Sequence, residues 1–190
     1  MIHRLTMPSI AIGLLIAPVA LAQMSHPNSV VGPAAATASK DALGQQDANF
    51  VKEATAGGAA EIELSKIAEK TENPGVKRFA ERMVHDHTTA NTELAGIATG
   101  LNVETPKTLD DDHQRIRDRL RNMHGKDFDR QYMQIMVEDH DQAVKLFRQE
   151  ASSGHDPKLK QFAQNTLPTI EQHQKMALDL SRRLSETAAR

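Results

Sequence analysis

The helical spacing of the apolar residues constrains this chain more than any other feature of its sequence. From residue 47 onward they recur at alternating steps of three and four, a pattern typical of helices that bury one stripe. It predicts four long helices, over about residues 47–70, 74–98, 127–152 and 157–186. Prolines at the start of the second and fourth helices support these boundaries, because the first turn of a helix accommodates a residue without an N–H.

The connections between these helices predict how they are arranged. Two of the three connections are short, and short connections make antiparallel neighbours, so we expect two helical hairpins. A long segment, 99–126, joins the hairpins and contains a short amphipathic helix, about 108–122, capped by Thr108, with Ile116 and Leu120 as its apolar contacts. The predicted fold class is therefore all-α: a ferritin-like four-helix bundle whose long crossover carries a short extra helix.

The composition suits such a bundle and argues against several functions. Trp is absent and there are only one Tyr and five Phe, so the core must consist mainly of aliphatic residues and methionine. The chain has no cysteine, which excludes disulfides, thiolate nucleophiles and Cys-based zinc sites. Its net charge of -2 argues against a nucleic-acid partner, which would require a basic face. The sequence also lacks nucleotide-binding glycine motifs and the nucleophile elbow of hydrolases.

The first residues are typical of a secretory signal peptide. A short positive start precedes an apolar stretch of about ten residues, too short to cross a bilayer, and Ala20-Leu21-Ala22 offers a cleavage site. We expect residues 1–22 to be a signal peptide, 23–46 a flexible linker and 47–187 the bundle domain. The predicted location is the periplasm, with outer-membrane association as the alternative, and without stable membrane insertion after cleavage. The alternative is that the apolar segment is kept as an anchor.

Three of the nine histidines fall on the predicted core-facing stripes of three different helices. They are His87, His140 and His173, and counting about 1.5 Å per residue from the two turns places all three near mid-bundle. Because neutral imidazole binds zinc, copper, iron and nickel, three rings at one level predict a transition-metal site. The alternative is that each ring is a buried polar group paired with a backbone carbonyl or a neighbouring Asp. His85, His113, His124 and His155 are expected on outward faces or in loops.

Residues near these histidines extend the predicted site. Glu61, on the stripe of the first helix, can add a carboxylate ligand, and Asp86 and Asp139 can orient the rings that follow them. Gly57 and Gly58 face the same level, where two glycines cost a helix about 1–2 kcal/mol relative to alanine. Either the helices approach closely there, or the glycines leave space for a ligand.

Three methionines suggest a copper variant of this site. Met83 and Met136 each precede an inward histidine by one turn, and Met176 follows one by about a turn. In the predicted topology they lie on the same side of the histidine level, and thioether ligands select Cu(I). The alternative is that methionine fills gaps in a core with few aromatic residues.

Several short phrases of the sequence together resemble one family. They are Phe50-Val51-Lys52-Glu53-Ala54, Gly57-Gly58 with Glu61, Met83-Val84-His85-Asp86-His87-Thr88, Val137-Glu138-Asp139-His140, and Thr166-Leu167-Pro168 with His173. In this combination, over about residues 47–182, the chain resembles a ferritin-like family of domains of unknown function, number 4142, of bacterial exported or predicted outer-membrane proteins. The resemblance implies a four-helix fold and export, and brings no established reaction.

The sequence leaves three kinds of function open, and with them whether the chain is an enzyme. It favours a non-enzymatic binding or envelope-stress module, with an envelope protein or a second copy of the chain as partner. The alternative is a bundle that binds copper, zinc or iron at the interior histidines. A di-iron redox enzyme is the third. It is disfavoured because the residues three positions after Glu81, Glu138 and Glu171 are not histidine, so the Glu-x-x-His motifs are missing.

Overall fold

The structure, a computed structural model, describes residues 43–188 as a set of helices. The helices are α1 (Gln45–Ala68), α2 (Pro74–Gly100), α3 (Asp111–Arg121), α4 (Gly125–Ser153) and α5 (Pro157–Ala188). The four long helices lie close to their predicted positions. The predicted signal peptide and almost all of the predicted linker lie outside the described residues, and α1 starts at Gln45, just inside the linker's expected end.

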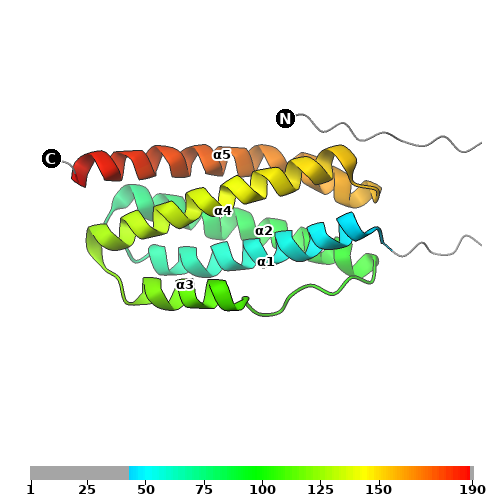
Figure 1. The fold of residues 1–190 in the computed structure, drawn as a ribbon, viewed down its shortest axis with the longest axis horizontal. Helices are drawn as coiled ribbons and strands as arrows, with labels where there is room; N and C mark the ends of the chain where they lie inside the picture. Colours follow the sequence, from blue (N-terminus) through cyan, green and yellow to red (C-terminus); the bar gives the residue numbers. More distant parts are fainter. Residues whose placement is uncertain (1–42, 189–190) are drawn as a thin grey trace, which may run out of the picture. The chain divides into compact units, whose positions relative to one another are not determined.

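The long helices form two antiparallel hairpins, α1 with α2 and α4 with α5, as Figure 1 shows. The hairpins pack together through α1 against α4 and α2 against α5. Because the crossover carries the chain back along the bundle, α2 and α4 run in the same direction (Figure 1). This is the predicted ferritin-like arrangement, and it brings all four long helices around one core.

Both hairpin turns are fixed by the same capping chemistry. The side chain of Asn73 accepts hydrogen bonds from the backbone N–H groups two and three residues further on, and so does that of Asp156. Each cap is followed by proline at the first helical position. The second helix of each hairpin therefore begins at a defined residue, which sets the height of the side chains that follow.

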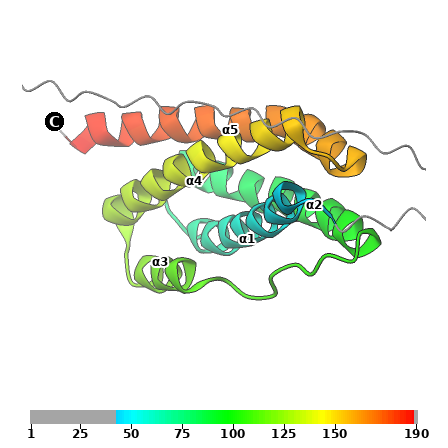
Figure 2. The same cartoon turned by 45° about the vertical axis from the view of Figure 1, so that its right-hand side comes forward.

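The crossover helix α3 lies beside α1 on the outside of the bundle (Figure 2). Leu120 is fully buried and Ile116 packs against the core, as predicted. The predicted cap is wrong: the helix begins at Asp111, and Asp110 instead of Thr108 accepts a hydrogen bond from the backbone N–H of His113. Asp110 holds the cap position because its carboxylate also bonds His113 Nδ1, at 2.6 Å.

The core consists of two apolar clusters, one toward each end of the bundle. The first apolar cluster includes Leu64, Phe79, Met83, Leu120, Tyr132, Met133 and Met136. The second apolar cluster includes Phe50, Leu94, Val144, Phe147, Leu159, Phe162 and Ile170.

None of the helices within residues 43–188 is long and apolar enough to cross a membrane.

Candidate metal centre

A layer of polar side chains lies between the two apolar clusters. Each long helix contributes one residue to it, at the point where the helix passes from one cluster to the other: Glu61 on α1, His87 on α2, His140 on α4 and His173 on α5. All four residues are buried, with no more than 5% of their surface exposed. Burying polar groups is costly unless each group has a hydrogen-bond partner. The contacts of these four residues therefore indicate the function of the layer.

The three imidazoles converge on one point. Their ring centroids are 5.3–5.7 Å apart, and one ring nitrogen from each residue lies within 4.8 Å of the other two. Three nitrogen atoms bound to a single zinc ion are about 3.4 Å apart, as bond lengths of about 2.1 Å require. His87, His140 and His173 therefore form a group that could hold one metal ion, with nitrogens somewhat further apart than in a metal-bound site.

The contacts of His140 determine which of its nitrogens carries the proton. Nδ1 lies 2.8 Å from the carbonyl oxygen of Met136 and 3.2 Å from Oε1 of Glu61. A carbonyl oxygen can only accept, so Nδ1 carries the hydrogen and donates it to Met136. The lone pair of His140 is therefore on Nε2, which is buried and has no hydrogen-bond partner among the described residues.

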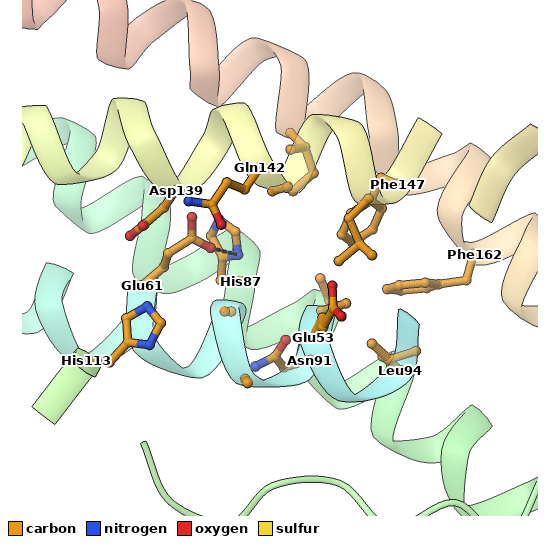
Figure 3. Close-up of a pocket in the computed structure, with 18 of the residues that line it drawn as sticks. Glu53, Glu61, His87, Asn91, Leu94, His113, Asp139, Gln142, Phe147 and Phe162 are labelled. Atoms are coloured by element: carbon orange, nitrogen blue, oxygen red, sulfur yellow. Dashed lines mark ion pairs between the residues drawn. The ribbon is translucent and has the colours of Figure 1, made fainter. Parts of the chain in front are cut away.

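The other two rings are held in the same manner. His87 Nδ1 lies 3.1 Å from Oε2 of Glu61, the ion pair drawn in Figure 3, and His173 Nε2 lies 2.9 Å from Oδ2 of Asp86. The Asp86 carboxylate accepts, so His173 Nε2 is the donor, and Nδ1 is the nitrogen of His87 that faces Glu61. The nitrogens left over, His87 Nε2 and His173 Nδ1, are buried and have no hydrogen-bond partner within residues 43–188.

Each ring thus has one nitrogen fixed by the protein and one free lone pair. Metal-binding histidines are held in this way, with the second ring nitrogen donating to a carboxylate or a backbone carbonyl. Every imidazole therefore lies against a protein group through one nitrogen and keeps the other nitrogen available, and binding of a metal stays a prediction.

Burial keeps the rings neutral. It lowers the pKa of His87, where the neighbouring His140 and His173 lower it further, and it lowers the pKa of His140 to about 4. Burial also lowers the pKa of His173, although the hydrogen bond to Asp86 opposes the shift. Neutral imidazole is the form that binds metal, so the layer is competent for metal binding at neutral pH.

The predicted accessory residues take different places. Glu61 lies against the Nδ1 atoms of His87 and His140, and burial, with Asp139 nearby, raises its pKa well above the usual range. Asp86 contacts the ring of His173 on α5 rather than that of its sequence neighbour His87. Asp139 touches none of the three rings at hydrogen-bond distance. Its buried Oδ2 has no partner among the described residues, and burial raises its pKa to about 6.

The methionines lie on one side of the polar layer. Met83 and Met136 are fully buried in the first apolar cluster, and Met176 packs against it. Whether their sulfur atoms bind a metal stays a prediction, because packing in this cluster also accounts for their burial.

The two glycines of α1 serve different purposes. At Gly58 an added Cβ would collide with the side-chain amide of Asn91, whose Nδ2 donates to the backbone carbonyl of Thr55 at 3.3 Å. At Gly57 an added Cβ would meet nothing within 4 Å. The close approach and the open space expected from the sequence as alternatives are therefore both present, one at each glycine.

The open space at Gly57 belongs to a pocket of about 310 Å³ beside the polar layer (Figure 3). Of the four residues in the layer, Glu61 and His87 line it. His113 lines it too, with its side chain 23% exposed, which corrects the expectation that this ring faces outward. By contrast, the side chains of His85 and His155 are 81% and 75% exposed, as predicted.

Sequence reasoning missed the part that the crossover plays in this pocket. Asp110 and His113, from the start of α3, line it together with Asn91 and Gln142. The sequence did offer Asp110 as a residue that can cap the start of a helix. No sequence pattern indicated that the start would lie against α1 and α4.

Fold and site together define a ferritin-like four-helix bundle with a buried cluster of three histidines that can hold a metal ion. The chain belongs to the family described as a domain of unknown function, DUF4142, whose pattern matches residues 32–180. A solved structure described as a DUF305 fragment from Deinococcus radiodurans has a similar fold, with a TM-score of 0.65 and 13% sequence identity. The similarity covers 74% of this chain and 98% of that one. Comparison with curated proteins finds no match.

Proposed function

We propose that this protein is a metal-binding bundle of the bacterial periplasm that holds one transition-metal ion through His87, His140 and His173. The observation that carries the proposal is the state of the six ring nitrogens. Three are committed to Glu61, Met136 and Asp86, and the other three are buried without a partner in the part of the chain that the structure describes. A metal ion satisfies all three free nitrogens at once, which no single protein group does.

The donor set favours zinc, copper, nickel or iron, the metals that neutral imidazole suits. Copper is the specific alternative raised by Met83, Met136 and Met176, which lie in the neighbouring first apolar cluster. A di-iron centre does not fit the described residues. Glu61 is the single carboxylate of the buried layer, whereas Glu81 and Glu138 are exposed, and di-iron bundles need four carboxylates on four helices.

Elemental analysis of the protein purified from the periplasm tests the proposal. We expect about one equivalent of transition metal, lost from the His87→Ala/His140→Ala/His173→Ala variant. His85→Ala is the matched control, since this residue lies two positions from His87 with an exposed side chain, and it should retain the metal. Equal, negligible metal in all three proteins, before and after incubation with Zn(II), Cu(I), Ni(II) or Fe(II), would rule the proposal out.

Export is part of the proposal and rests on the signal-like segment of residues 1–22. The same purification tests it, because recovery in the periplasmic fraction with a new N-terminus near Gln23 supports cleavage. Recovery in the inner membrane with an intact N-terminus would support the anchor instead. A role in envelope stress or in binding an envelope protein stays a prediction, as does the absence of a nucleic-acid partner.

A further inference from the structure

The pocket beside the histidine layer has two chemically different ends. Figure 3 shows Phe147, Phe162 and Leu94 together at one end, and Glu61, Asp139 and Gln142 with His87 at the other. A pocket of about 310 Å³ with mostly apolar walls and a few polar groups has the size and character of a small-molecule site. Its occupant should therefore have an apolar body and one polar head.

The charges around the pocket determine what that head should be. The residues of the described chain that line it include four acids and neither lysine nor arginine. The acids are Glu53, Glu61, Asp110 and Asp139. Such a lining disfavours anions and favours a cation, which stabilises the ionised form of the carboxyl groups it contacts.

Two of these carboxyl groups have oxygen atoms in need of a hydrogen-bond donor. Asp139 Oδ2 and Glu61 Oε1 are buried and have no hydrogen-bond partner among residues 43–188. The nearby Nδ1 of His140 does not serve Glu61 Oε1, because its hydrogen is committed to the Met136 carbonyl. Unmet buried acceptors are costly, and a ligand that supplies donors to both recovers that cost. A protonated amine has three donors and a positive charge.

A metal ion fits the acidic end of this pocket less well than a protonated amine does. The cluster of metal-ligating groups found in the described residues consists of the three histidines and does not include Glu61 or Asp139. The apolar end lined by Phe147 and Phe162 also offers nothing to a hydrated metal ion.

We infer that this pocket is a binding site for a small amine, with its ammonium group at Glu61 and Asp139 and its apolar body against Phe147, Phe162 and Leu94. The inference goes beyond the proposed metal site and does not require a bound metal, although Glu61 and His87 belong to both the histidine layer and the pocket. A protein without metal should bind the amine.

Calorimetric titration of the chelator-treated full chain at neutral pH tests this inference with three matched probes. They are 2-phenylethylamine, 2-phenylethanol and 3-phenylpropionate, which share an aromatic body and carry a cationic, a neutral and an anionic head. We expect the amine to bind at least tenfold more tightly than the alcohol and the carboxylate to bind most weakly. Equal affinities, a preference for the carboxylate, or no binding of the amine would overturn the inference.

Two variants locate the binding. Gly57→Leu projects a side chain into the open space of the pocket and should weaken amine binding at least tenfold. Gly96→Leu is the matched control, because this α2 glycine also has nothing within 4 Å of an added Cβ but does not line the pocket. It should bind as the wild type does. Asp139→Asn should abolish most of the preference for the amine over the alcohol, and an unchanged preference would contradict the assignment of the head group even if Gly57→Leu failed to fold.

Discussion

Oε2 of Glu61 lies 3.1 Å from Nδ1 of His87, linking α1 to α2 inside the core. This contact gives the glutamate a role different from that of a ligand. It fixes one nitrogen of the ring, and the other nitrogen stays free. The carboxylate therefore acts on a bound metal through the imidazole, by orienting the ring and making its free nitrogen more basic.

Glu61→Gln should weaken metal binding without abolishing it. The amide keeps the shape of the side chain but removes the charge, and the loss of a partner of this kind typically costs about 10–100-fold in metal affinity. Competition titration with a chromophoric chelator measures the change. Glu63→Gln, at an exposed position on the same helix, is the control and should not alter the affinity. Complete loss of binding in Glu61→Gln would show instead that Glu61 is itself a ligand.

Asp86 should matter through His173. Asp86→Ala removes the acceptor for His173 Nε2 and leaves a buried N–H unpaired, which costs about 1–3 kcal/mol in the free energy of unfolding. Metal affinity should fall together with stability, and Asp86→Asn, which keeps an acceptor oxygen, should lie between. Denaturant unfolding of the metal-free proteins measures the stability change. Arg82→Ala removes only the exposed ion-pair partner of Asp86 and should change the stability little. An Asp86→Ala protein as stable as Arg82→Ala would contradict the importance of the His173 contact.

Protonation of the buried histidines should destabilise the metal-free protein as the pH falls from about 6.5 toward 4, whereas Glu61 and Asp139, whose pKa values are raised, act in the opposite direction. Burial lowers the pKa of His140 to about 4, whereas the unfolded chain takes up this proton near the ordinary histidine value of 6.5. Below that pH the unfolded state binds more protons, so the free energy of unfolding drops by up to about 1.4 kcal/mol per pH unit from this residue. His87 and His173, whose pKa values are also lowered, act in the same direction.

His140→Leu isolates the contribution of one ring. Unfolding of the variant and the wild type, both metal-free, should be compared at pH 7 and pH 5. We expect the wild type to lose more stability than the variant over this interval. Parallel pH profiles would mean that His140 takes up its proton equally in the folded and unfolded states.

The adjacent glycines of α1 should respond in opposite directions to the same substitution. Gly57→Ala adds a methyl group in open space and should stabilise the protein by about 0.5–1 kcal/mol, the usual gain in a helix. Gly58→Ala forces the Asn91 amide away from Thr55 and should destabilise the protein by about 1–3 kcal/mol.

Thermal unfolding of the two single variants, together with Gly58→Ala/Asn91→Ala, measures this difference. The double variant should regain much of the lost stability, since the clash disappears with the amide. Equal effects at Gly57 and Gly58 would contradict the close approach of α2 to α1 at Asn91.

Much of the fold could be predicted because it depends on local signals. The spacing of apolar residues gave the long helices, and the Asn73-Pro74 and Asp156-Pro157 steps gave their turns, since capping and proline geometry act within a few residues. The inward position of His87, His140 and His173 followed from the same periodicity. The start of α3 was misplaced because Thr108 and Asp110 are both good caps, and contact with His113 favours Asp110.

The partners of the histidines could not be predicted in the same way. Asp86 precedes His87 in sequence, yet it contacts His173, because neighbouring residues on a helix point in directions about 100° apart. Asp139, next to His140, points into the pocket for the same reason. Periodicity assigns a residue to a face of its helix, while the rotation and separation of packed helices decide which side chain of another helix it meets.

The sequence by itself determined that this chain forms two helical hairpins and that three imidazoles face the interior, because helix formation, capping and burial of an apolar stripe are properties of short segments. Only the tertiary structure decided that one nitrogen of each imidazole is fixed and the other free, and that Gly57 opens into a pocket with acidic residues at one end. Those features arise where side chains from α1, α2, α4 and α5 meet, at distances of a few ångströms that helix packing alone sets.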